Sequence, residues 1–368
     1  MKRWFLILTI LIMVVSSLGN ARAEIELDGK FVTLKDEKGR VITRTAHQVS
    51  IGDEYLTSNN GLYRVTKVEG EIATARLVRK ERLKAESRTG LRALINNLSQ
   101  MRAEVKDKGP IVIYHTHSDE SYVPTDGKSS QKGNGGIFRV GEALTKAFEQ
   151  NGIPVVHDKS SHDPHDALAY DRSRRTAAQL LKKQPSCILD VHRDAVPPEE
   201  YSKIINGKGV TKVQLVVGRE NPNFKANNDF AKQVKAVVDK KYPGLIKGIF
   251  YGTGKYNQDL GPRTLLLEFG THTNSRDSAE RGAAIFAEAA SDVLYGAAGA
   301  GFINRGSLQS LFWIIVAVVG GIGLFFLINR GGLKGIGKEF AGAVGEERLD
   351  PEDEFEATED NQGNQGKL

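Results

Sequence analysis

Apolar and polar positions alternate between residues 24 and 80, in short runs separated by turn residues. Alternation with a period of two is typical of half-buried β-strands. The dipeptide Asn60-Gly61 lies between two of these runs, which is a strong signal for a hairpin. The pattern predicts a small β domain over residues 24–80. Its single histidine, His47, has no other catalytic candidate beside it, and we interpret it as structural.

Residues 81–108 are strongly charged, with apolar residues at helical spacing, and predict an amphipathic helical linker. Over residues 109–300, apolar strand-like runs alternate with helical patterns. This order predicts an α/β domain: a three-layer, mostly parallel sheet with helices on both faces. The strands are expected at 111–114, 153–158, 187–191, 213–218, 247–252 and 264–269, and the helices at 136–150, 171–184, 224–241 and 276–295.

The first residues have the layout of a secretory signal peptide. Lys2 and Arg3 precede an apolar run, and Ala21-Arg22-Ala23 follows as an A-x-A cleavage motif. We predict a signal peptide over residues 1–23, with an uncleaved N-terminal anchor as the alternative. In both cases the chain that follows is exported.

A second apolar segment, residues 308–328, carries no charged residue and is long enough to span a bilayer as a single transmembrane helix. Basic residues follow it at Arg330, Lys334 and Lys338, and they favour the cytoplasmic side. The predicted topology is a catalytic domain outside the cell membrane, a C-terminal anchor, and a cytoplasmic tail over residues 329–368.

The net charge limits the classes of partner, and the cysteine content limits the covalent cross-links. The net charge is +6, which permits an anionic partner such as a cell-wall polymer or a membrane surface. Nucleic-acid binding is poorly supported, because the chain is exported and lacks interleaved aromatic and basic residues. The single cysteine, Cys187, excludes an internal disulfide framework.

Three predicted strands end in side chains suited to a metal. The first is followed by His115, His117 and Glu120, the second runs into His192, and the third ends at Glu268. In a parallel sheet these ends lie on the same edge, so the side chains can converge there. If the first strand continues in extended form, His115 and His117 point to the same face.

Histidine nitrogens and a carboxylate oxygen are ligands that suit Zn²⁺, and three protein ligands leave a fourth position for water, as in hydrolytic zinc sites. A second carboxylate outside the ligand set can carry protons, and Glu268 is the candidate for this base. Asp190, two residues before His192 on the same strand face, is the candidate that orients His192.

Several motifs resemble the stage II sporulation protein P family. They are YHTHSDESY, SCILDVHRDA, VVGREN and KYNQDLGPRTLLLEFG, which occur in the family's order over most of residues 109–296. That family is related to zinc-dependent N-acetylmuramoyl-L-alanine amidases, which have a three-layer α/β domain. The resemblance implies cleavage of the amide between muramic acid and the stem peptide, with endopeptidase activity as well. It also implies action on septal peptidoglycan during endospore engulfment, together with a lytic transglycosylase partner.

The resemblance also implies roles for individual residues. His117 and His192 correspond to zinc-binding histidines, and Glu268 to the catalytic glutamate. The acidic zinc ligand of the amidases opens the first helix of the domain, where residues 131–135 of this chain contain no acid. Glu120 is therefore the first candidate for the acidic ligand, and Glu142 is the second.

The remaining candidates have weaker support. His115, Arg139, Arg193, Asn257 and Asn274 are candidates for supporting the ligands or contacting the substrate, and for the arginines and Asn257 a salt bridge or a turn is the alternative. A non-catalytic, membrane-anchored protein that binds peptidoglycan or acts as a scaffold is the alternative function. A further group is interpreted as a loop rather than as ligands: His157, His162 and His165.

Overall fold

The structure is a computed structural model that describes residues 27, 29–83, 108–166, 168–295, 313, 316, 317 and 320. The chain divides into two units, Met1–Phe302 and Ile303–Leu368, and the strands among the described residues belong to the first. The predicted signal peptide and cytoplasmic tail, residues 84–107 of the predicted linker and most of the segment 308–328 lie outside the described residues. Within the described part, no helix is long and apolar enough to cross a membrane.

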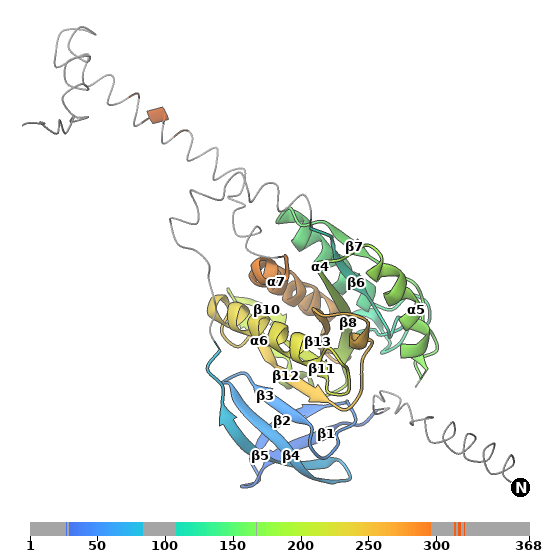
Figure 1. Ribbon diagram of the computed structural model, residues 1–368, viewed down its shortest axis with the longest axis vertical. Helices are drawn as coiled ribbons and strands as arrows, with labels where there is room; N and C mark the ends of the chain where they lie inside the picture. Colours follow the sequence, from blue (N-terminus) through green and yellow to red (C-terminus); the bar gives the residue numbers. More distant parts are fainter. Residues whose placement is uncertain are drawn as a thin grey trace, which may run out of the picture. The chain divides into compact units, whose positions relative to one another are not determined.

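Eleven strands form one sheet in the order β2-β1-β5-β4-β3-β12-β11-β13-β8-β6-β7 (Figure 1). Its second half comes from the predicted α/β region. The strands there are β6 (Ile111–Tyr114), β7 (Val155–His157), β8 (Cys187–Asp194), β11 (Val213–Gly218), β12 (Ile246–Gly252) and β13 (Thr264–Thr271). The helices are α3 (Val123–Asp126), α4 (Ile137–Gln150), α5 (Ala169–Leu181), α6 (Phe224–Lys241) and α7 (Arg276–Tyr295), with short 3₁₀ turns η1 (Pro198–Glu200) and η2 (Gln258–Leu260).

The predicted parallel arrangement is confirmed for most of this half. β7, β6, β8 and β13 run parallel in succession, and β11 is parallel to β12. The exception is the antiparallel pair β11 and β13. As a result, β6, β8 and β13 end on one edge of the sheet, while β11 and β12 end on the other.

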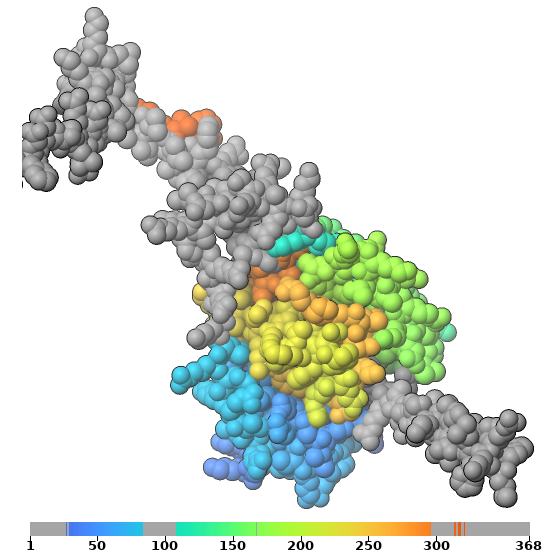
Figure 2. All heavy atoms as spheres, in the orientation of Figure 1, coloured from blue at the N-terminus to red at the C-terminus, as the bar shows by residue number. Residues whose placement is uncertain are grey.

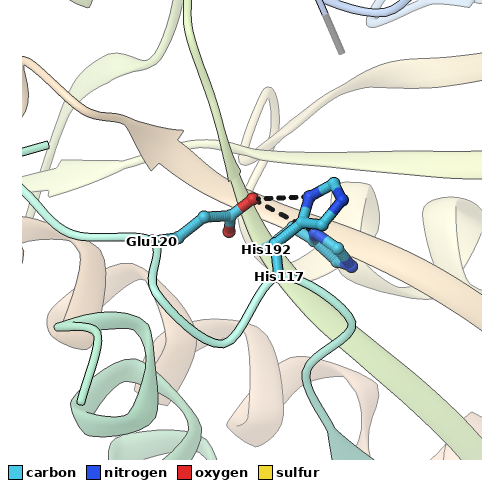
Figure 3. Close-up of side chains that lie close together, drawn as sticks. All are labelled: His117, Glu120 and His192. Carbon is cyan, nitrogen blue, oxygen red and sulfur yellow. Dashed lines mark hydrogen bonds and ion pairs between the residues drawn. The ribbon is translucent and has the colours of Figure 1, made fainter. Parts of the chain in front are cut away.

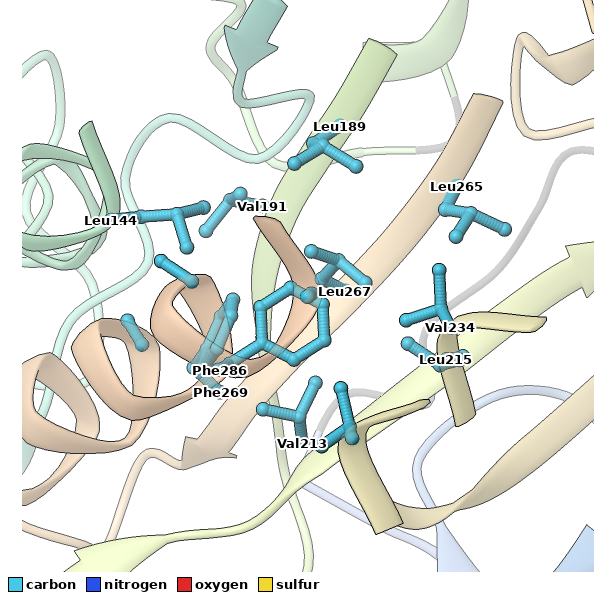
Figure 4. Packing of buried hydrophobic residues seen from close by; sticks show 14 of the residues in the cluster. Leu144, Leu189, Val191, Val213, Leu215, Val234, Leu265, Leu267, Phe269 and Phe286 are labelled. Carbon is cyan, nitrogen blue, oxygen red and sulfur yellow. The ribbon is translucent and has the colours of Figure 1, made fainter. Parts of the chain in front are cut away.

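One face of this half-sheet is covered by helices and is apolar. Leu144 of α4, Val234 of α6 and Phe286 of α7 pack with strand residues such as Leu189 and Leu267 in the largest buried cluster (Figure 4). Each of these helices has an apolar stripe, which it buries against the sheet. The opposite face is covered by α5, whose Ala177 and Leu180 pack on β6 and β8, and by the N-terminal strands.

The region predicted as a small β domain forms five strands, but they continue the central sheet. β3 pairs antiparallel with β12, and Asn60, in the predicted hairpin turn, has a positive φ of 67°. The atoms of these strands (blue) lie directly against the following part of the chain (Figure 2). Tyr55 from these strands packs in one cluster with Val216, Phe250 and Leu266. The strands are β1 (Val32–Asp36), β2 (Val41–Thr45), β3 (Glu54–Thr57), β4 (Gly61–Glu69) and β5 (Ile72–Lys80).

The sequence pattern did not predict one hairpin. β9 (Ser202–Ile205) and β10 (Lys208–Thr211) pair antiparallel in a separate two-stranded sheet, with Asn206 and Gly207 at its turn, both at positive φ. The hairpin packs on α7 and follows directly after Tyr201, whose hydroxyl donates a hydrogen bond to Glu268.

Candidate metal centre

The three strand ends that the sequence singles out lie next to one another. β8 is flanked by β6 on one side and β13 on the other, with all three parallel. Across β8 and β13, His192 pairs directly with Glu268. Paired residues on neighbouring strands project from the same face, so both side chains emerge on the face opposite the helix-covered core.

His117, Glu120 and His192 bring their ligand atoms within 4.8 Å of one another (Figure 3). Oε1 of Glu120 lies 3.1 Å from Nδ1 of His117 and 3.3 Å from Nδ1 of His192. The other oxygen of Glu120 accepts a hydrogen bond of 2.8 Å from the backbone N–H of Arg193. All three side chains are buried, and the carboxylate is held in a fixed orientation between the two rings.

This donor set fits zinc. Two imidazole nitrogens and one carboxylate oxygen converge from one side, which matches the three-ligand pattern of catalytic rather than structural zinc sites. Burial opposes the charge of Glu120, but His192, His117 and Arg193 hold the pKa of its carboxyl well below the ordinary value. The carboxylate is therefore ionised at neutral pH and available to a cation.

The second ring nitrogen of His192 has its own partner. Nε2 lies 2.9 Å from Oδ1 of Asp190, the residue that the strand period places on the same face. The Asp190 carboxylate also accepts hydrogen bonds from the backbone N–H of Thr116 (2.8 Å) and from its hydroxyl (2.6 Å). A carboxylate behind a histidine fixes its ring orientation and raises its basicity as a ligand.

Glu268 lies beside this cluster in a buried polar network. Its Oε2 accepts hydrogen bonds from Nε2 of Gln214 (2.5 Å) and from the hydroxyl of Tyr201 (3.0 Å). Its Oε1 lies 2.8 Å from Nε2 of His47. The Tyr201 hydroxyl is also 2.9 Å from Asp194, a second buried carboxylate, whose pKa is raised to about 6 by burial and by the charge of Glu268.

The pKa of Glu268 itself lies below its ordinary value. Burial would raise it, but His47, Lys247 and Tyr201 together favour the ionised form. Glu268 is therefore ionised at neutral pH. As the pH falls, Asp194, with a pKa of about 6, takes up a proton before Glu268 does. The site consequently offers a cluster of side chains that could hold a metal ion and, on the next strand, an ionised carboxylate outside that cluster.

Comparison with known proteins identifies the family. The model of the Stage II sporulation protein P family matches residues 38–291. The chain belongs to the Stage II sporulation protein P family. It is 33% identical over 210 residues to Stage II sporulation protein P of Bacillus subtilis (strain 168), a match that covers 52% of each chain. The chain thus spans about half the length of this curated relative.

Solved structures give more distant matches. The amidase Ami1 of Mycobacterium smegmatis is 15% identical, with a TM-score of 0.33, over 52% of this chain and 96% of that one. The CwlD amidase of Clostridioides difficile, solved in complex with the GerS lipoprotein, is 13% identical with a TM-score of 0.33, over 50% of this chain and 98% of that one. The assignment to the Stage II sporulation protein P family rests on the sequence match.

The expectation that His115 and His117 point to the same face of the sheet is wrong. β6 ends at Tyr114, so the strand alternation does not extend to the histidines. His115 turns to the helix-covered side, where Nδ1 lies 2.8 Å from the carbonyl oxygen of Val191 and Nε2 lies 2.8 Å from Nε2 of His157. His115 is therefore not brought into the cluster.

Three other residues that the sequence suggests, Arg193, Asn257 and Asn274, lie outside the ligand cluster and form hydrogen bonds. Arg193 donates its backbone N–H to Glu120, and its guanidinium donates to the carbonyl of Ser129. Asn257 donates to the carbonyl of Tyr170 and to Ser173, and Asn274 accepts from the backbone N–H of Thr271.

The alternative acid and its neighbour lie outside the cluster. Glu142 is on α4, and it forms surface ion pairs with Arg139 (2.8 Å) and Lys159 (2.5 Å). Arg139 is exposed and contacts this glutamate rather than the site. Of the two acids considered for the ligand set, only Glu120 lies between the histidines.

The sequence interpretation missed several contributors. His47 was interpreted as structural, yet its ring reaches Glu268. Gln214 carried a usable signal, because an amide inside the apolar run VQLVVG requires a buried partner. His165 was interpreted as a loop residue, and its ring stacks on His117 at 3.8 Å while Nδ1 lies 3.1 Å from Asp119. Tyr201 gave no signal, because its position depends on the unpredicted hairpin β9–β10.

Proposed function

We propose that this chain is a zinc-dependent peptidoglycan hydrolase that cleaves the amide between N-acetylmuramic acid and the stem peptide. The observation that carries the proposal is the buried cluster of His117, Glu120 and His192 with the ionised Glu268 on the adjacent strand. The choice of bond follows from the resemblance of the sequence motifs to the amidases and from membership of the family.

His117, Glu120 and His192 would hold the zinc ion. When bound, zinc supplies Lewis acidity to a scissile carbonyl and lowers the pKa of water toward neutrality. Asp190 holds the ring of His192 in the ligating orientation through its contact with Nε2. The backbone N–H of Arg193 holds Glu120 through the oxygen that faces away from the rings.

Glu268 moves the protons of the reaction. Hydrolysis joins the oxygen of water to the carbonyl carbon, breaks the C–N bond and transfers a proton to the departing nitrogen. An ionised carboxylate can take the proton from water and then donate it to that nitrogen. The hydrogen bonds from Tyr201 and Gln214 to Oε2 of Glu268 keep the carboxylate in place during this transfer.

The test is product analysis by mass spectrometry after purified chain is incubated with peptidoglycan, with and without a chelator. The proposal expects free stem peptides that begin with the alanine once joined to muramic acid, loss of these products in chelator, and their return when zinc is added back. Release of peptides in the presence of chelator would contradict the zinc requirement. Cleavage only between peptides would replace the amidase assignment with an endopeptidase, and binding without cleavage would favour the scaffold alternative.

A further inference from the structure

The end of β2 and the loop after it extend from the N-terminal strands onto the catalytic edge of the sheet. Nζ of Lys247 donates to the carbonyl of Arg44 at 2.7 Å, and the backbone N–H of Ala46 donates to Oδ1 of Asp194 at 3.0 Å. The next residue, His47, places Nε2 2.8 Å from Oε1 of Glu268. The N-terminal strands therefore contact the site through two consecutive residues, Ala46 and His47.

We propose that His47 is a positioning residue for Glu268, so that the N-terminal strands complete the catalytic site. This inference rests on the proposed function, in which Glu268 transfers the protons. It assigns a role in the reaction to a region that the sequence pattern presents only as a β domain without chemistry.

The imidazole of His47 is itself held in place. Its ring stacks on Phe250, with centroids 5.4 Å apart and planes 17° apart, and meets the ring of Tyr256 edge-on at 6.0 Å. Its backbone N–H donates to the hydroxyl of Thr45 at 3.2 Å. Only 13% of the His47 side chain is exposed. Because packing fixes the ring, little conformational entropy is lost when it holds the carboxylate.

The contact of His47 with Glu268 adds to the restraints on the Glu268 carboxylate. Gln214 and Tyr201 both bind Oε2 of Glu268, so their hydrogen bonds leave the carboxylate free to pivot about that oxygen. Nε2 of His47 lies 2.8 Å from Oε1, so the ring restrains the second oxygen of the carboxylate. It also favours the ionised form, because its interaction with Glu268 is the largest of those that lower the pKa of that carboxyl against burial.

The test uses three variants of the full chain: His47→Ala, His47→Gln and, as a matched control, Arg44→Gln. Arg44 pairs with Glu200 at 2.6 Å and anchors the same strand, but its side chain does not contact Glu268 in the structure. For His47→Ala we expect kcat to fall about 10- to 100-fold, as for the loss of an orienting partner elsewhere, with KM and bound zinc unchanged. His47→Gln, whose amide can donate to Oε1, recovers most of the turnover, and Arg44→Gln retains wild-type turnover.

A double-mutant cycle shows whether His47 acts through Glu268. In a Glu268→Gln background, His47→Ala costs no further turnover, because the group it positions has already lost its charge. Wild-type kcat in His47→Ala, a rise in kcat, or additive losses in the cycle would overturn the proposal. A loss of zinc or of thermal stability that accounts for the lower activity would likewise overturn it.

A readout without turnover separates this inference from the proposed function. In ¹⁵N-histidine NMR of the full chain, the ring signal of His47 is expected to shift in Glu268→Gln but not in Arg44→Gln. If the wild type cleaves no peptidoglycan and the shift is present, the contact stands and the proposed function fails. If the wild type cleaves and the shift is absent, the inference fails by itself.

Discussion

The two faces of the central sheet are built from the same strands and have opposite characters. On β8, Leu189 and Val191 point into the helix-covered core, whereas the alternate residues Asp190 and His192 point to the site. The same alternation holds on β13, where Leu267 lies in the core and Glu268 in the site. A strand with a period of two can thus contribute to an apolar core and to a polar candidate site at once.

The difference between the two faces shows that apolar burial and paired polar groups lie on opposite sides of the same strands. The helix-covered face gains stability from apolar burial, which is non-directional. On the site face, each buried polar group would cost free energy unless it were paired. Asp190, for example, binds His192 and both the backbone and the hydroxyl of Thr116. The pairing offsets the cost of burial and also fixes the orientation of the side chains in the candidate site.

The largest expected effect comes from the site face. Glu268→Gln keeps the shape of the side chain but removes its ability to carry a proton. We expect kcat to fall about 100- to 10,000-fold, the usual contribution of a general acid–base group, while zinc content and the free energy of unfolding change little. Parallel measurements of kcat, bound zinc and urea unfolding check this. Loss of the metal in this variant would place Glu268 in the ligand set and contradict its role as the base.

The matching change on the core face is Phe286→Ala. Phe286 is fully buried and meets the ring of Phe269 edge-on, with centroids 5.7 Å apart. Truncation is expected to lower the free energy of unfolding by about 3–5 kcal/mol, whereas kcat and KM of the folded chain stay near wild type. Urea unfolding and kinetics at a temperature where the variant is folded check both statements. A selective loss of kcat without loss of stability would break the division between the two faces.

A smaller effect tests a polar pair on the helix-covered side. His157 lies 2.8 Å from His115 through their Nε2 atoms, and burial lowers the pKa of His157 from 6.5 to about 4. Between these pH values the unfolded chain binds a proton that the folded chain does not, so stability rises with pH. Acidification from pH 6.5 to 5 is therefore expected to cost at most about 2 kcal/mol through this residue.

His157→Asn removes this contribution and should flatten the pH dependence of the free energy of unfolding over the same interval. The comparison uses the slope with pH rather than the absolute stability, so a general cost of the substitution cancels. An unchanged slope would mean that His157 is not neutral in the folded chain at pH 5.

The site-forming strand ends were predictable because two local signals coincide there. Short apolar runs that end in His117, His192 and Glu268 predict strands, and parallel strands end on one edge. The structure brings these residues together with Glu120. The face of His115 was predicted wrongly because the pattern does not show that β6 ends at Tyr114.

What the sequence did not reveal depends on contacts between distant segments. His47 reaches Glu268 because β3 pairs with β12, a pairing that no local pattern encodes. Tyr201 enters the site only because the hairpin β9–β10 follows it. Gln214 faces Glu268 because β11 runs antiparallel to β13, contrary to the parallel order expected for the domain. Such positions follow from the global topology rather than from periodicity.

The most direct test of the central claim is the zinc content of the purified chain after dialysis, compared between Glu120→Gln and Glu142→Gln. Glu120 lies between His117 and His192, whereas Glu142 lies on α4 and forms surface ion pairs with Arg139 and Lys159. We predict one zinc per chain in the wild type and in Glu142→Gln, and loss of zinc in Glu120→Gln. Zinc retained in Glu120→Gln, or lost in Glu142→Gln alone, would contradict the metal centre described above.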